Sequence, residues 1–360
     1  MSEWKEGTLY EVLNVVMGQS PKGDTCNSDG IGLPLLNGPT EFGIKFPTPV
    51  QFTTDAKRVS EVGDILFCVR GSTTGRMNWA DQPYAIGRGI AAIQHKEGKE
   101  FSAFGRALID YNLPLLLSSS TGSTFPNVSR SQLEKLEIFI PPKEEQKAIA
   151  AVLSSLDDKI DLPHRQNKTL EQMAETLFRQ WFVEEADEGW EEGKLGELIR
   201  IGSGKALKKE KYIENGKYPI LGANGEIGRT NEYLFDDRLI FTGRVGTLGN
   251  VFRVENEKVW LSDNTLVINP KKYYNFIYFI LKDAQFEQYN VGSTQPLVRQ
   301  SDIKEIDVIL SEKTIHIKFE KQANIFFEKI KSNQTQIRTL EKMRDAILPK
   351  LMSREVTIKM

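Results

Sequence analysis

The chain has 360 residues, a length that favours two domains of ordinary size over one continuous core. Its 39% hydrophobic and 27% charged residues are typical of a soluble globular protein, and the lack of any run of 18 apolar residues excludes a membrane span. The net charge of −2 argues against a strongly basic, non-specific DNA binder, while two cysteines and three histidines exclude a disulfide framework and a close-spaced zinc site. Residues 1–7 show no basic region followed by an apolar run, so we expect no signal or transit peptide and a cytoplasmic protein.

Three blocks of the sequence occur twice. Gly18 and its repeat Gly204 follow the first block at the same spacing, and the second block places Arg70 and Arg244 at equivalent positions after an apolar segment. A repeat of this length predicts two similar domains. The paired blocks are residues 4–13 and 190–199, 186 positions apart; residues 64–75 and 238–249, 174 apart; and residues 122–128 and 292–298, 170 apart.

A long helix is predicted after each domain. In both repeats a short alternating segment, residues 136–140 and 306–310, predicts a half-buried strand. Apolar residues then recur at alternating steps of three and four, which is typical of a coiled-coil seam. Pro163 lies on this seam, and because proline lacks a backbone donor and crowds the preceding turn, we expect a kink or a break there. The expected seam contains Leu153, Leu156, Ile160, Leu170, Leu177 and Trp181 in the first helix, and Phe326, Ile330, Ile337, Leu340, Ile347 and Leu351 in the second.

These segments predict an α+β protein with two similar domains separated by a long antiparallel two-helix coiled coil. The first helix carries the chain from one domain to the next and the second helix leaves the second domain, so paired seams must run antiparallel, with an approximate two-fold axis across them. Two similar domains held at a fixed separation suit a DNA duplex with two half-sites. The expected boundaries are residues 1–140 and 190–310 for the domains, 141–184 and 311–353 for the helices, and 354–360 for a short tail.

This order strongly resembles the specificity subunit of type I restriction-modification systems. The resemblance covers nearly the whole chain and is carried by residues 63–70, 122–126, 140–146, 159–161 and 167–171 in that order. It implies a non-catalytic reader of double-stranded DNA in which each domain reads one part of an interrupted site. It also implies that the helices dock two methyltransferase (modification) subunits, through which restriction subunits join. The cofactors S-adenosylmethionine, ATP and Mg would belong to those partners, with no cofactor or metal in this chain.

Candidate DNA contacts lie in loops. An arginine such as Arg70 or Arg244 can bind a phosphate or the edge of guanine, although a salt bridge that pins its own loop is an equal alternative. The hydroxyls of Ser123, Thr124, Ser293 and Thr294 can hold phosphates or simply form a turn. Base readout is expected where the two repeats differ, although any one such side chain is more often a solvated surface group. These candidates are Arg76, Asn78 and Arg88 in the first domain, Lys205, Lys208, Lys209, Lys211, Asn224 and Arg229 in the second, and Ser129, Arg130 and Arg299 after the Ser-Thr loops.

Aromatic and aliphatic residues near the helix ends exceed what a two-helix seam needs. We therefore expect part of this apolar bulk to contact the methyltransferase subunits. The second helix lacks the Ile-Pro-Pro start of the first, so docking through it is the less secure expectation. The residues in question are Phe178, Trp181 and Phe182 in the first helix and Leu348, Leu351 and Met352 in the second.

Two other functions are alternatives to a DNA reader. Catalysis by this chain is disfavoured. Residues 202–206 resemble a phosphate loop, but that motif needs Gly six residues before Lys205, where the chain has Ile199, and Ser or Thr after it, where the chain has Ala206. Residues 241–246 resemble a methyltransferase cofactor loop only faintly, and no Asn-Pro-Pro-aromatic motif accompanies them. A non-catalytic helical scaffold with two protein-binding globules would explain the repeat and the near-neutral charge without DNA. Salt-dependent DNA binding in the presence of partner subunits separates these alternatives.

Overall fold

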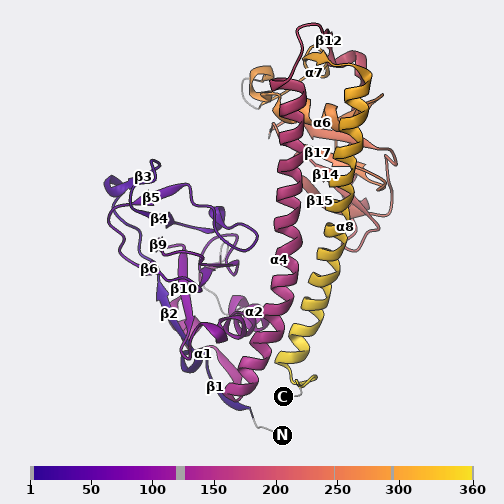
Figure 1. Ribbon diagram of the computed structural model, residues 1–360. Helices are drawn as coiled ribbons and strands as arrows, with labels where there is room; N and C mark the ends of the chain where they lie inside the picture. Colours follow the sequence, from indigo (N-terminus) through magenta and orange to yellow (C-terminus); the bar gives the residue numbers. More distant parts are fainter. Residues whose placement is uncertain (1–3, 119–125, 247, 293–295, 359–360) are drawn as a thin grey trace. The chain divides into compact units, whose positions relative to one another are not determined.

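The computed structural model describes residues 4–118, 126–246, 248–292 and 296–358 (Figure 1). The chain forms two compact units, Met1–His164 with Gln334–Met360, and Arg165–Asn333. Each unit contains one domain of mixed helices and strands: domain one lies in the first unit and domain two in the second. Each also contains part of two long helices, α4 (Lys143–Arg179) and α8 (Lys313–Met352). The expected α+β fold with an internal repeat is therefore confirmed. None of the described helices is long and apolar enough to cross a membrane.

Domain one is built on a four-stranded antiparallel sheet in the order β2-β10-β7-β8 and a five-stranded sheet in the order β3-β5-β4-β9-β6. A separate strand pair joins β1 to β11. The strands are β1 (Lys5–Thr8), β2 (Leu13–Met17), β3 (Cys26–Asn27), β4 (Leu33–Leu36), β5 (Gln51–Thr53), β6 (Val59–Ser60), β7 (Ile65–Cys68), β8 (Met77–Trp79), β9 (Tyr84–Ile86), β10 (Ile90–His95) and β11 (Glu137–Ile140). The helices are α1 (Leu9–Val12), α2 (Ser102–Ser118) and α3 (Arg130–Glu134), with 3-10 turns η1 (Gly23–Thr25), η2 (Pro39–Glu41) and η3 (Lys99–Phe101).

The central strands of domain one are buried on both faces, which explains why β7 reads as an unbroken apolar run. Ile65 and Phe67 face a core shared with α2 and the first turns of α4, which lie against each other in Figure 1. Leu66 and Cys68 face the smaller core beneath the five-stranded sheet. Burying one such large apolar side chain contributes roughly 1.5–3 kcal/mol, so both faces stabilise the sheet.

Domain two repeats this plan. Its four-stranded sheet has the order β13-β19-β16-β17, a strand pair joins β12 to β20, and the second sheet is reduced to three strands, β15-β14-β18. The strands are β12 (Glu191–Lys194), β13 (Ile199–Ser203), β14 (Tyr218–Gly222), β15 (Gly225–Thr230), β16 (Leu239–Gly243), β17 (Val251–Val254), β18 (Trp260–Leu261), β19 (Thr265–Pro270) and β20 (Asp307–Leu310). The helices are α5 (Leu195–Leu198), α6 (Tyr274–Asp283) and α7 (Gln300–Lys304), with 3-10 turns η5 (Lys209–Lys211) and η6 (Phe286–Tyr289).

The match between Gly18 and Gly204 holds at the level of hydrogen bonds. The Gly18 amide donates to Ile90 O at 2.9 Å, and the Gly204 amide donates to Thr265 O at 3.2 Å. A Cβ atom at either glycine would lie 2.1 Å from a backbone carbonyl oxygen. Both repeats therefore need glycine here because only glycine allows the two chain segments to approach so closely.

The match between Arg70 and Arg244 is wrong by one residue. The Arg244 amide donates to Asn264 O, as the Val69 amide donates to Gly89 O, so Arg244 occupies the place of Val69. The counterpart of Arg70 is Val245, because Arg70 forms an isolated bridge to Asn127 before α3 and Val245 forms one to Leu297 before the equivalent helix α7. The slip arises because the loop after β7 is one residue longer than the loop after β16. In an extended chain a one-residue shift turns the side chain to the other face, so the two arginines leave the backbone in opposite directions.

The two long helices pack antiparallel within each unit, as expected. Ile149 and Leu153 of α4 share the core of domain one with Leu351 of α8, so the beginning of α4 meets the end of α8. In the other unit Leu177 of α4 shares a core with Phe326 of α8. Each helix pair is thus buried against its own domain as well as against its partner helix.

Of the kink or break expected at Pro163, the break is absent. Helix α4 runs unbroken from Lys143 to Arg179 and ends in a π-turn, η4 (Gln180–Glu184). Proline removes one backbone hydrogen bond from the helix, but the Pro163 ring is buried. Burial of the ring on the seam offsets that loss, so the helix tolerates proline at this position.

Candidate nucleic-acid interface

Five of the candidate DNA contacts lie in loops that meet at one end of the four-stranded sheet of each domain: Arg70, Arg76 and Arg88 in domain one, and Lys205 and Arg244 in domain two. In domain one the ends of β2 and β7 lie beside the starts of β8 and β10, because the register pairs Ile90 with Cys68 and Phe67 with Met77. In domain two β13, β16, β17 and β19 meet in the same way. We call this part of each domain the sheet-end surface. It comprises residues 18–20, 69–76, 87–89 and 126–128 in domain one, and residues 204–206, 244–246, 248–250, 262–264 and 296–298 in domain two.

Three exposed arginines lie on the sheet-end surface of domain one. Arg70 forms a backbone bridge to Asn127, and its guanidinium has no hydrogen bond or ion pair with any residue that the structure describes. Arg76 reaches Pro39 O at 3.5 Å, and Nε of Arg88 reaches Ser20 Oγ at 3.4 Å. The salt bridge that would pin Arg70 to its own loop is therefore not found in the described part of the chain, and none of these charges is neutralised by a described acid.

Asn78 does not belong to this surface, contrary to expectation. Its side chain is only 2% exposed, and its Nδ2 donates to Gly43 O at 2.8 Å. Asn78 lies at the centre of β8, where the strand alternation directs it inward between two half-buried neighbours. Its amide holds the loop around Gly43 and cannot contact DNA in this conformation.

The sheet-end surface of domain two carries Lys205 and Arg244. Lys205 is exposed, and its backbone is fixed by a bond from its amide to Leu261 O at 2.9 Å and one from Trp260 Nε1 to its own oxygen at 2.7 Å. Arg244 is half-exposed and has no ion pair with a described residue. Asn224 accepts a bond from Asn250 at 3.1 Å, which ties the β14–β15 turn to the same surface. The structure thus brings these three candidates together.

Other candidates in domain two are engaged locally. Arg229 donates to Gly216 O, to Lys217 O and to Glu226, so its guanidinium is bound within its own domain and is not free to read a base in this conformation. Lys211 pairs with Glu232 at 2.7 Å, and Lys208 lies 3.7 Å from Glu210. Lys209 is exposed in the same 3-10 turn.

The candidates that follow the Ser-Thr loops lie at helix starts. Ser129 caps α3, since its Oγ accepts from the Gln132 amide at 3.3 Å, and Arg130 pairs with Glu134 at 2.7 Å. Arg299 is exposed and its amide donates to Asp302 at 3.1 Å. The remaining four candidates, Ser123, Thr124, Ser293 and Thr294, lie outside the described residues.

The apolar bulk at the helix ends fills the cores of the two units, so the expectation that it contacts partner subunits is largely wrong. Phe178 is 2% exposed and packs 5.3 Å from Phe279, and Phe182 packs 5.2 Å from Phe319. Leu351 and Met352 are buried in the core of domain one. The expectation considered only apolar contacts between the two long helices, whereas α2 and α6 also pack against them. Trp181 and Leu348 keep partial exposure.

Polar networks fasten each domain to the helix pair of its own unit. Glu320 of α8 accepts from the amides of Asn275 and Phe276, at 3.2 and 2.9 Å, and so caps the start of α6. Lys282 of α6 pairs with two carboxylates of α4, Glu171 at 3.1 Å and Glu175 at 2.9 Å. These contacts attach domain two to the parts of α4 and α8 in its own unit.

Comparison with known proteins identifies the family. Residues 1–172 and 187–342 each match the family described as type I restriction modification DNA specificity domain. The chain belongs to this family. The type I restriction enzyme MjaIX specificity subunit of Methanocaldococcus jannaschii is 30% identical over 351 residues, which cover 84% of this chain and 79% of that protein. The HindI specificity subunit of Haemophilus influenzae is 22% identical over 476 residues, covering 99% and 100%.

A solved structure supports the fold. The type I restriction-modification S subunit from M. genitalium matches with a TM-score of 0.60 and 21% identity, covering 100% of this chain and 97% of that one. The match of both halves of the chain to the DNA specificity domain family makes it a type I DNA specificity subunit, the non-catalytic component of such enzymes. The described residues of this specificity subunit contain no group of three His, Cys, Asp or Glu placed to hold a metal ion.

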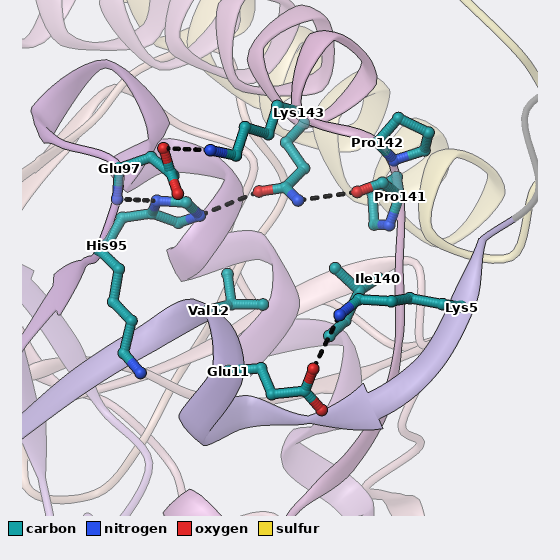
Figure 2. A pocket seen from close by; sticks show the side chains of 11 residues that line it. Lys5, Glu11, Val12, His95, Glu97, Ile140, Pro141, Pro142 and Lys143 are labelled. Carbon is teal, nitrogen blue, oxygen red and sulfur yellow. Dashed lines mark hydrogen bonds and ion pairs between the residues drawn. The ribbon is translucent and has the colours of Figure 1, made fainter.

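A polar pocket of about 440 Å³ shows how the family-typical segment at the start of α4 is used (Figure 2). His95 bonds to Gln146 at 3.0 Å, and Gln146 donates to Pro141 O at 2.7 Å. Glu97 pairs with Lys143 at 2.7 Å. Burial lowers the pKa of His95, which favours its neutral form. The polar groups satisfy one another, so we interpret this pocket of the specificity subunit as a joint between domain one and α4 and not as a catalytic site.

Sequence reasoning missed a set of apolar residues that the helices leave exposed. These residues lie outside the seam positions, and an apolar residue outside the seam of a predicted helix is the sequence signal that could have identified them. Each is between 45% and 54% exposed, a large fraction for apolar side chains on regular helices. The set comprises Leu162 and Met173 on α4 and Ile317, Ile325 and Met343 on α8.

Proposed function

We propose that this specificity subunit reads an asymmetric, interrupted DNA site, with the sheet-end surface of each domain contacting one half. The observation that carries the proposal is the repetition of one backbone frame in both domains, with exposed cations such as Arg70, Arg88 and Lys205 that lack described acidic partners. Such cations neutralise DNA phosphates and can reach base edges in a groove. Residues 1–140 and 190–310 are the proposed reading domains.

The two half-sites differ because the shared frame carries different side chains. Gln19 in one domain has Lys205 as its counterpart in the other, since their amides donate to Ile86 O and Leu261 O, so equivalent positions present different chemistry. The helices, proposed as residues 141–184 and 311–353, fix the number of unread base pairs between the half-sites. Changing helix length should therefore change the spacer and leave both half-sites unaltered.

The proposed partners are two methyltransferase subunits, through which restriction subunits join. Their docking surface includes the exposed apolar residues of the helices, such as Met173 and Ile325, together with the half-buried seam residues Leu156 and Ile330. The methyltransferase flips an adenine out of the duplex and methylates it with S-adenosylmethionine, while ATP and Mg serve the restriction subunits. The net charge of −2 predicts weak DNA binding by the chain alone, because partners supply much of the phosphate neutralisation.

The test is to express this chain with the methyltransferase and restriction subunits of its own system, in a host free of DNA methylation, and to map modified bases across the genome. A single interrupted motif with a modified adenine on each strand is the expected result. An assembled complex that modifies no motif and binds no DNA would contradict the proposal and favour a scaffold with two protein-binding globules.

A further inference from the structure

One tight turn on the sheet-end surface occurs in both domains with opposite charges. In domain one the turn is closed by the Ile90 amide, which donates to Gly87 O at 3.0 Å, and its exposed second residue is Arg88. In domain two the Thr265 amide donates to Ser262 O at 3.1 Å, and the exposed second residue is Asp263. The two residues therefore occupy the same place in the same type of turn.

The backbone around the turn is held identically in the two domains. Each turn accepts and donates bonds to three neighbouring segments, so the Cα positions of Arg88 and Asp263 are fixed by the sheet and not by their own side chains. In domain one the bonds run from Gly87 N to Leu36 O, Gln19 N to Ile86 O and Val69 N to Gly89 O. In domain two they run from Ser262 N to Leu221 O, Lys205 N to Leu261 O and Arg244 N to Asn264 O.

The side-chain surroundings match this difference in charge. Ser20 accepts from the amide of Arg88 at 3.3 Å and from its Nε at 3.4 Å, which orients the guanidinium. The equivalent of Ser20 is Ala206, which offers no such acceptor. Asp263 has no hydrogen bond or ion pair between its carboxylate and any described residue, although its turn bonds to the backbones of Lys205 and Arg244. The carboxylate is therefore available to a ligand.

A carboxylate on a DNA-facing surface is repelled by phosphate, so its favourable partner is a base amino group. Aspartate accepts a hydrogen bond from cytosine N4, and arginine donates two bonds to O6 and N7 of guanine. We propose that Arg88 and Asp263 are specificity-determining residues: Arg88 selects a guanine in the half-site read by domain one, and Asp263 selects a cytosine in the half-site read by domain two. This inference rests on the proposed function of the sheet-end surfaces.

The experiment compares the modified-base maps of Arg88→Ala and Asp263→Ala with that of the wild-type chain, each assembled with its methyltransferase subunits. Truncation should remove the preference at one base pair of one half-site, a guanine for Arg88 and a cytosine for Asp263. Discrimination at that base pair should fall by about 10- to 100-fold, and the other half-site and the spacer should be unchanged. Matched controls are Lys96→Ala and Glu257→Ala, exposed charges next to strands β10 and β17 at the opposite end of each sheet, which should leave the motif intact.

The outcomes separate the two levels of the argument. An unchanged motif in both variants overturns the assignment of Arg88 and Asp263, as does a uniform loss of methylation at all sites without a change in motif, which would indicate a phosphate contact or a structural turn. Failure of the wild-type complex to modify any bipartite motif overturns the proposed function itself and the inference with it. Relaxation of one base pair per variant supports both.

Discussion

Asn333 of α8 donates a hydrogen bond to Asn167 of α4 at 2.9 Å inside a seam that is otherwise mainly apolar. Asn333 is 1% exposed, and its amide also reaches Gln166 at 3.2 Å. A buried amide donor of this kind is paired in only one alignment of the two helices, because another alignment takes its acceptors away. The Asn333 Oδ1 atom is itself buried without a described partner, so the donor Nδ2 carries the pairing. The pair therefore selects the register of α4 against α8 in this unit.

Removing one member of this pair should destabilise the protein. We expect Asn333→Ala to lower the free energy of unfolding by about 1–3 kcal/mol, because the Asn167 side chain loses its partner. The double variant Asn167→Leu with Asn333→Leu should recover most of that stability, since two apolar side chains replace both polar groups. Urea unfolding of both variants and of the exposed control Gln334→Ala measures this. Equal losses in the single and double variants would contradict the register role.

His316 should make domain two sensitive to acid. Its ring is 1% exposed, stacks 4.1 Å from Tyr273 and 5.0 Å from Phe182, and has no hydrogen-bond partner among the described residues. Burial, assisted by the charge of Lys272, lowers the pKa of His316 from 6.5 to about 4. Between these pH values His316 binds a proton in the unfolded chain but not in the folded chain. The contribution of neutral His316 to the free energy of unfolding is therefore fully present above pH 6.5 and is lost as the pH falls toward 4.

The His316→Phe variant should lose this part of the acid sensitivity. Urea midpoints measured at pH 7.5 and pH 5 give the comparison, with His164→Gln as a control on the helix surface. The wild-type midpoint should drop between the two pH values by more than that of the variant. A His316→Phe protein with the full wild-type drop would show that another group, such as the buried His95, accounts for the acid sensitivity.

Arg70 should contribute to affinity for all DNA sequences alike. Its guanidinium is exposed and unpaired in the described structure, and Gly71 and Gly75 beside it adopt positive φ angles of 92° and 96° that fix the loop. Arg70→Ala in the assembled complex should reduce the slope of log K against log salt concentration by about 1 and leave the recognised motif unchanged. Lys96→Ala is the control. An unaltered salt slope would place Arg70 outside the phosphate contacts.

Core and surface residues of the long helices should respond differently to substitution. Phe178→Ala should cost about 3–5 kcal/mol of stability, because it opens a cavity in the aromatic core of domain two.

Ile325 lies on an exposed part of α8. The Ile325→Asp variant should leave the unfolding midpoint nearly unchanged while weakening co-purification with the methyltransferase subunit. The proposed docking role of the exposed apolar residues fails if Ile325→Asp and Met173→Asp complexes assemble as well as wild type.

The apolar periodicity and the internal repeat were enough to predict the two domains and the two long helices from the sequence. The seam pattern predicted both helices, and the Gly18 and Gly204 match survived because close backbone approach leaves only glycine at those positions. The match between Arg70 and Arg244 was wrong because the loops before Gly75 and Gly249 differ in length by one residue. The two glycines are equivalent, but the same spacing carried back across the loop places Arg244 one position too late. Loop length is visible only in the strand register.

Individual site residues were harder to predict because sequence does not show which face of a short strand is buried. Asn78 and Arg229 are both polar residues in or beside a strand, yet one is buried and the other donates three bonds within its domain. The turn that carries Arg88 and Asp263 was found only through its hydrogen bonds, since the two sequences around it share no motif.

The exchange of one reading domain tests the central claim most directly. Residues 1–140 would be replaced with the corresponding domain of another type I specificity subunit of known target, and modified bases would be mapped for the assembled complex. The account predicts a motif in which one half-site takes the donor's sequence while the other half-site and the spacer length stay as in the wild type. A change in both half-sites, or in neither, with the complex assembled, would contradict it.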